Sequence, residues 1–164
     1  MKKLLFLLVF IPLVSFGQED IERYKVYETT NIYTSLLLDT ATGQIWQLQI
    51  GIGDTDQLKT VLSDYKYAES VEEVTEYHNE RMTKWEEDYN SKADSIVSPE
   101  DKKYWKPLGL DERLSYSNIA KNGRFKLYPT ENIKNFIMVD VIDGRTWQVQ
   151  WHHDEDKRLV LRFY

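Results

Sequence analysis

Hydrophobic and polar positions alternate along two stretches of this chain, residues 23–50 and 124–151. Apolar side chains at every second position indicate β-strands with one buried face. Each stretch predicts an alternating strand, then a continuous apolar run at 36–38 or 136–139, then a second alternating strand that carries tryptophan. The uninterrupted run predicts a central strand covered on both faces. A fourth strand is expected near 58–62 and again at 158–164.

The two stretches are copies of one unit. They align without a gap at an offset of 101 residues, and 11 of 28 aligned positions are identical. A duplicated unit predicts two tandem four-stranded meanders in an α+β, mainly antiparallel β fold. Because one meander is too small to be stable alone, we expect the copies to bury their Trp-bearing faces together around a pseudo-twofold axis. The sequence leaves open a sandwich or one partly closed barrel.

The segment between the copies is helical in pattern. Ser70 followed by Glu73 is a capping box, and apolar residues then recur at helical spacing until about residues 90–91. A shorter second helix is expected to open at Ser98 and stop before Pro107, with a loop over 109–122. We expect the long helix to cover an exposed sheet face. The domain division is a repeat over 23–62, a helical insert over 68–108 and a repeat over 123–164.

The N-terminus has the pattern of a secretory signal peptide over residues 1–17. Lys2 and Lys3 precede an apolar run at 4–14, and small residues stand before Gln18, where we expect cleavage. The run is shorter than the roughly 20 residues that span a bilayer, and an uncleaved anchor is the alternative. Without cysteine the chain is not a lipoprotein. We therefore expect a single domain over 18–164, periplasmic or secreted, with no stable membrane insertion.

Composition narrows the classes of function. The formal net charge is −6, the pI is about 5.1, and no basic cluster is present, which argues against nucleic-acid binding. The absence of cysteine means that a packed core, and not disulfides, must stabilise the fold.

Possible catalytic or metal-binding residues have simpler structural interpretations. Asp39 and Asp140 suggest paired carboxylates, but an Asp that opens a hairpin loop closed by glycine accepts backbone N–H bonds. His152 and His153 are followed by three acidic residues, yet neighbours on a strand point to opposite faces. A solvated turn is favoured over a weak site for a hard cation. We expect no cofactor, no metal site and no enzymatic activity. The alternative is a hydrolase that acts on envelope or extracellular polymers through carboxylates.

Glutamines are retained at equivalent positions in both copies, which is unusual for a freely solvated face. Their amides are expected either to be partly buried and bonded to neighbouring strands or the helix, or to form a binding surface with nearby Arg and Tyr side chains. The candidate binding residues are Gln47, Gln49, Gln148, Gln150, Arg23, Arg124, Tyr27 and Tyr128. We therefore expect a non-catalytic binding or envelope-associated interaction module. Its partner would be an envelope protein, a peptide or a glycan, with a homo-oligomer as a further alternative.

The second copy, GRFKLYPTENIKNFIMVDVIDGRTWQVQW, resembles a pattern of small exported bacterial proteins of uncharacterised function. The resemblance rests on Gly123-Arg124-Phe125, Pro129-Thr130-Glu131-Asn132, Asp140 and the segment 144–150. The first copy departs from it at Glu28 and Gln44. The resemblance covers the repeats but not the insert, and implies a shared fold and export without an activity. The Asp-x-x-x-Gly-x-x-Trp part is also similar to a propeller-blade hairpin, although two copies do not close a propeller.

Overall fold

The computed structural model describes residues 21–51, 53, 56–91 and 106–164. The expected signal peptide over residues 1–17 lies outside these ranges, as does nearly all of the helix expected from Ser98. Within them, no helix is both long enough and apolar enough to cross a membrane.

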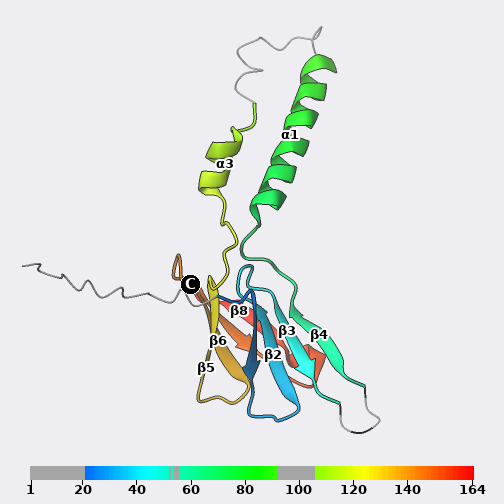
Figure 1. The fold of residues 1–164 in the computed structure, drawn as a ribbon, viewed down its shortest axis with the longest axis vertical. Helices are drawn as coiled ribbons and strands as arrows, with labels where there is room; N and C mark the ends of the chain where they lie inside the picture. The colour runs from blue at the N-terminus through cyan, green and yellow to red at the C-terminus, as the bar shows by residue number, and fades with distance from the viewer. Residues whose placement is uncertain (1–20, 52, 54–55, 92–105) are drawn as a thin grey trace, which may run out of the picture.

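Two separate four-stranded antiparallel sheets make up the body of the molecule (Figure 1), as the repeats predict. Each sheet is a meander in chain order, so each copy of the repeat forms its own sheet and no barrel closes. Sheet 1 contains β1 (Tyr24–Glu28), β2 (Thr34–Asp39), β3 (Ile45–Gln49) and β4 (Leu58–Ser63). Sheet 2 contains β5 (Phe125–Pro129), β6 (Asn135–Asp140), β7 (Thr146–Gln150) and β8 (Leu159–Arg162).

Strand register is the same in the two sheets. In sheet 1, Tyr27, Leu36, Gln47 and Thr60 form one row across the four strands. The residues 101 positions later form the corresponding row of sheet 2, namely Tyr128, Ile137, Gln148 and Leu161. The offset therefore holds through the fourth strand.

Each sheet has two chemically distinct faces, which we name by their β3 or β7 residue. The Gln face carries Gln47 in sheet 1 and Gln148 in sheet 2. The Trp face carries Trp46 in sheet 1 and Trp147 in sheet 2. Register places the other members: the Gln faces contain Tyr27 and Leu36, or Tyr128 and Ile137, and the Trp faces contain Val26 and Leu37, or Leu127 and Met138.

The sheets stack face to back. The core contains Leu36, Leu38 and Ile45 from the Gln face of sheet 1. From sheet 2 it contains the Trp face, with Phe125, Leu127, Phe136, Met138, Trp147 and Val149. The prediction that both Trp-bearing faces pack together is therefore wrong, since a twofold axis between the sheets would pair equivalent faces. The physical reason is volume: bulky rings fill space best against smaller aliphatic side chains, whereas two ring-bearing faces would overfill the gap.

The helical insert leaves the sheets uncovered. Helix α1 (Val71–Ser91) and helix α3 (Leu110–Tyr116) extend together beyond one end of the sheets (Figure 1). Val74 is the buried hydrophobic residue of α1. The expectation that the long helix covers a sheet face is wrong, and α3 occupies part of the segment expected to be a loop. Asp111 and Glu112 in its first turn suit a helix N-terminus.

Local signals at the start of α1 are confirmed. The Glu73 N–H donates to Ser70 Oγ at 3.1 Å, and the Ser70 N–H donates to Glu73 Oε2 at 2.8 Å. A hydrogen bond from Lys66 and that from the Ser70 N–H lower the pKa of Glu73. The two ends of the helical insert lie side by side, because Glu69 and Ile119 form a parallel bridge.

The β2–β3 hairpin loop joins the two repeats. The Phe125 N–H donates to the Thr40 carbonyl at 2.8 Å, and the Gly123 N–H donates to Thr40 Oγ1 at 3.0 Å. Tyr67, which follows β4, packs here with its ring centroid 4.5 Å from that of Trp147. After the insert, the chain thus bonds directly to the β2–β3 loop of sheet 1. These bonds position sheet 2 against sheet 1.

Gly43→Ala is expected to destabilise the protein more than Gly144→Ala, although the two glycines are repeat equivalents. Both have positive φ, 81° and 78°, so each substitution costs about 1–2 kcal/mol of backbone strain. A Cβ on Gly43 would also lie 2.8 Å from the Tyr67 ring and 3.2 Å from the Phe125 ring. Gly144 has open space, so Gly43→Ala should cost about 1–3 kcal/mol more. Urea unfolding of both variants measures the difference, and equal losses would contradict the tight junction.

Candidate interaction surfaces

An arginine–aspartate pair ties the first strand of each repeat to the end of the second. Arg124 binds Asp140 through Nε, at 3.1 and 3.0 Å from the two carboxylate oxygens, and through Nη2 at 2.8 Å. Arg23 Nη2 lies 3.2 Å from Asp39 Oδ2. In the second repeat both side chains of the pair, Arg124 and Asp140, are buried, whereas in the first repeat the Arg23 side chain is 55% exposed. Each of these arginines, predicted as a binding residue, therefore joins two strands within its own repeat.

The aspartates also cap their hairpin loops, as the structural interpretation predicts. Asp39 Oδ1 accepts the Ala41 N–H at 2.9 Å, and Asp140 Oδ1 accepts the Ile142 N–H at 3.0 Å. Burial alone would raise the pKa of Asp140, but hydrogen bonds from Arg124 and the Ile142 N–H outweigh it and lower the pKa. Each carboxylate is thus paired with an arginine of its own repeat.

The four glutamines do not share a surface. Gln47 is 2% exposed between the sheets, and its Oε1 has no hydrogen-bond partner within the described part of the chain. Gln49 is partly buried on the same face. Gln148 and Gln150 lie on the outer face of sheet 2, where Gln150 Nε2 donates to the Lys157 carbonyl at 2.8 Å. The repeat-equivalent glutamines are thus separated, because the Gln face of sheet 1 is buried between the sheets whereas the Gln face of sheet 2 is on the outside.

The two tyrosines are separated in the same way. Tyr27 lies at the seam between the sheets, and its hydroxyl accepts the Leu127 N–H at 3.3 Å. It lines a cavity of about 360 Å³ with Lys25 and Lys126. Tyr128 is exposed on the outer face of sheet 2. The eight predicted binding residues therefore do not form one site.

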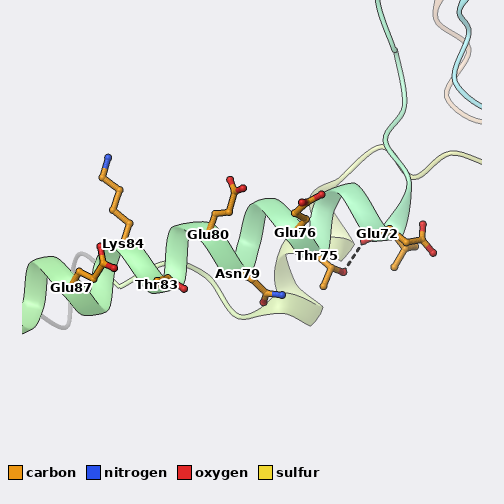
Figure 2. Close-up of a pocket in the computed structure, with 9 residues that line it drawn as sticks. Glu72, Thr75, Glu76, Asn79, Glu80, Thr83, Lys84 and Glu87 are labelled. Carbon is orange, nitrogen blue, oxygen red and sulfur yellow. Dashed lines mark hydrogen bonds between the residues drawn. The ribbon is translucent and has the colours of Figure 1, made fainter.

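The histidine–acidic segment 152–156 follows β7 as a turn. His152 Nδ1 accepts the Asp154 N–H at 2.9 Å, in the turn before a short 3₁₀ helix, Glu155–Lys157. Among the described residues, no group of three or more His, Cys, Asp or Glu side chains could hold a metal ion. Figure 2 shows a hollow whose lining comes wholly from α1, including Glu72, Glu76, Glu80 and Glu87, with side chains directed away from the helix. It is a solvated acidic helix face.

Face-to-back stacking leaves one Trp face and one Gln face without a partner sheet, and these are the surfaces that sequence reasoning missed. On the outer Trp face of sheet 1, Tyr24, Val26 and Val61 are exposed. On the outer Gln face of sheet 2, Tyr128, Ile137 and Leu161 are exposed. A signal was present, because both faces of each repeat carry apolar residues, which a two-sheet sandwich cannot bury completely.

No family model matches the chain, and comparison with curated proteins and with solved structures found no match.

Proposed function

We propose that this chain is an exported, non-catalytic interaction module that binds protein through the outer faces of its two sheets. The observation that carries the proposal is the pair of unpartnered sheet faces with large exposed apolar side chains. Single exposed hydrophobic residues are ordinary on a protein surface, but clusters on a sheet face are typical of interaction sites.

The nature of the exposed side chains favours protein as the partner. On the outer Trp face, the Lys59 ammonium lies 4.3 Å from the centroid of the Trp46 ring, and the Tyr24 ring lies 6.5 Å from that ring. Aromatic residues surrounded by aliphatic side chains are enriched at the centres of protein interfaces. Both faces are also free of the helices, which extend beyond the end of the sheets (Figure 1).

Cross-linking in the cells that produce the protein tests the proposal. The tagged full chain is compared with Val61→Glu on the outer Trp face and Leu161→Glu on the outer Gln face, which are 51% and 57% exposed. Ile32→Glu is the matched control, because Ile32 is exposed in the β1–β2 turn, outside both sheets.

The proposal predicts a cross-linked protein species, with this chain or another, that at least one face variant loses and Ile32→Glu retains. Each introduced carboxylate should leave the fold intact because its position is already exposed. If the wild type gives no protein cross-link, or if both face variants cross-link as it does, the proposed function is wrong.

A further inference from the structure

The contact between the two sheets shows which surfaces of this repeat fit each other. Inside the chain, the Gln face of sheet 1 packs on the Trp face of sheet 2. The two outer faces are one Trp face and one Gln face, which are the repeat equivalents of the two buried ones. We propose that the outer Trp face of sheet 1 binds the outer Gln face of sheet 2 in a second copy, head to tail. The inference rests on the proposed function, since it names the partner of the same surfaces.

The outer Gln face retains the side chains that make its buried counterpart fit. Tyr128 replaces Tyr27, Ile137 replaces Leu36, and Gln148 corresponds to Gln47. At the edge of the sheet, Phe163 stands where Leu62 packs against the core, and Phe163 is exposed. This face thus repeats, in a solvent-exposed setting, a surface that the molecule already buries against a Trp face.

The outer Trp face is a more polar version of the face that sheet 2 buries. Trp46 corresponds to Trp147, and Leu48 to Val149. Ser35 replaces Phe136, and Lys59 replaces Val160. Less apolar area is therefore available between copies than within the chain, so we expect the association to be reversible and concentration-dependent.

The hairpin loops give independent support. The loop of the first repeat is buried at the junction, including Thr40 and Ala41, while its counterpart in the second repeat exposes Val141 and Ile142. An aliphatic pair therefore lies in solvent at a loop whose equivalent is covered by the next sheet. In the proposed contact, the Tyr24 N–H would meet the Val141 carbonyl of the second copy, as the Phe125 N–H meets the Thr40 carbonyl at 2.8 Å.

Head-to-tail contact has a geometric consequence. Two different faces meet, so association produces closed rings or open chains and not a dimer through equivalent faces. With two sheets per chain, a ring of two to four copies would contain about four to eight four-stranded sheets, the range found in β-propellers.

Mixing two variants tests the geometry. By sedimentation, the mass of the wild type should rise with concentration above that of one chain. Val61→Glu and Leu161→Glu, each alone, should associate at least roughly tenfold more weakly, since burying an unpaired carboxylate is unfavourable. An equimolar mixture should recover a one-to-one dimer but nothing larger, because each variant retains the face that its partner needs. Ile32→Glu should behave as the wild type, and unchanged melting temperatures verify folding.

Because the chain has no cysteine, a disulfide trap locates the contact. Glu22 and Val141 are the repeat equivalents of Gly123 and Thr40, whose N–H and Oγ1 are 3.0 Å apart. Glu22→Cys mixed with Val141→Cys should give a covalent heterodimer faster than either forms a homodimer.

A wild type that stays at the mass of one chain up to millimolar concentration would overturn the inference. So would a mixture that shows no recovery. If the cellular cross-links instead contain only a different protein, lost in a face variant, the proposed function stands and the head-to-tail partner is wrong. If no cross-link depends on either face, both fail.

Discussion

Trp147→Ala is expected to lower the free energy of unfolding by about 3–5 kcal/mol. Trp46→Ala should lower it by only about 1–2 kcal/mol, because Trp46 is half-buried. The two tryptophans occupy equivalent positions in the repeats. Trp147 is 3% exposed between the sheets, with ring contacts to Tyr67 and Phe125, so its loss leaves a cavity in the core. Trp46 lies on the outer face, where water can fill the space that its ring leaves.

Denaturant unfolding of both variants measures this difference, and unchanged m-values show that the compared states are the same. The comparison is internally matched, because the same side chain is removed from the same strand position. Equal losses would mean that both Trp faces are buried alike, which would contradict face-to-back stacking. The measurement belongs at a concentration at which the wild type is a single chain.

Arg124→Ala is expected to destabilise the protein by about 3–5 kcal/mol, because it removes the buried partner of a buried carboxylate. Within the described residues, Asp140 would keep only one ion pair, with the partly exposed Arg145 at 3.1 Å. The Arg124 guanidinium also donates to the Ile119 carbonyl at 2.8 Å, so its loss frees the segment where the insert returns to the sheets. Thermal and urea unfolding measure the effect. Arg23→Ala is the matched comparison and should cost less, about 1–3 kcal/mol. Asp39 is buried, but the Arg23 side chain is 55% exposed, so water can reach the carboxylate once the arginine is removed.

The pH dependence of the same variant checks the cause. In the folded wild type the pKa of Asp140 lies below its ordinary value of 3.8. The carboxylate therefore contributes stability that is present above pH 3.8 and is lost as pH falls through the lower folded pKa. Removing Arg124 takes away its hydrogen bond and its charge, so the pKa of Asp140 rises relative to the wild type and protonation should relieve part of the damage. The gap in stability between wild type and variant should narrow in acid; a constant gap would contradict the ion-pair explanation.

Much of the fold could be predicted because its determinants are local. The capping box at Ser70 and Glu73 determines where α1 begins, since both hydrogen bonds join residues three apart. The positive φ at Gly43 and Gly144 and the loop-capping bonds of Asp39 and Asp140 are equally short in range. The candidate site was harder to predict: Gln47 and Gln148 are indistinguishable in sequence, yet one is buried and the other partly exposed on an outer face.

The sequence by itself determined the repeat, the strands and the turns; the structure then showed that the offset of 101 continues through β4 and β8. Period-two alternation decides which residues share a face, because successive side chains on a strand point to opposite sides. Only the tertiary structure decided which face each sheet buries. That choice depends on how well the Trp face of sheet 2 fills the surface around Leu36 and Leu38, a matter of complementary volumes between residues far apart in the chain. The same choice left two unlike faces open.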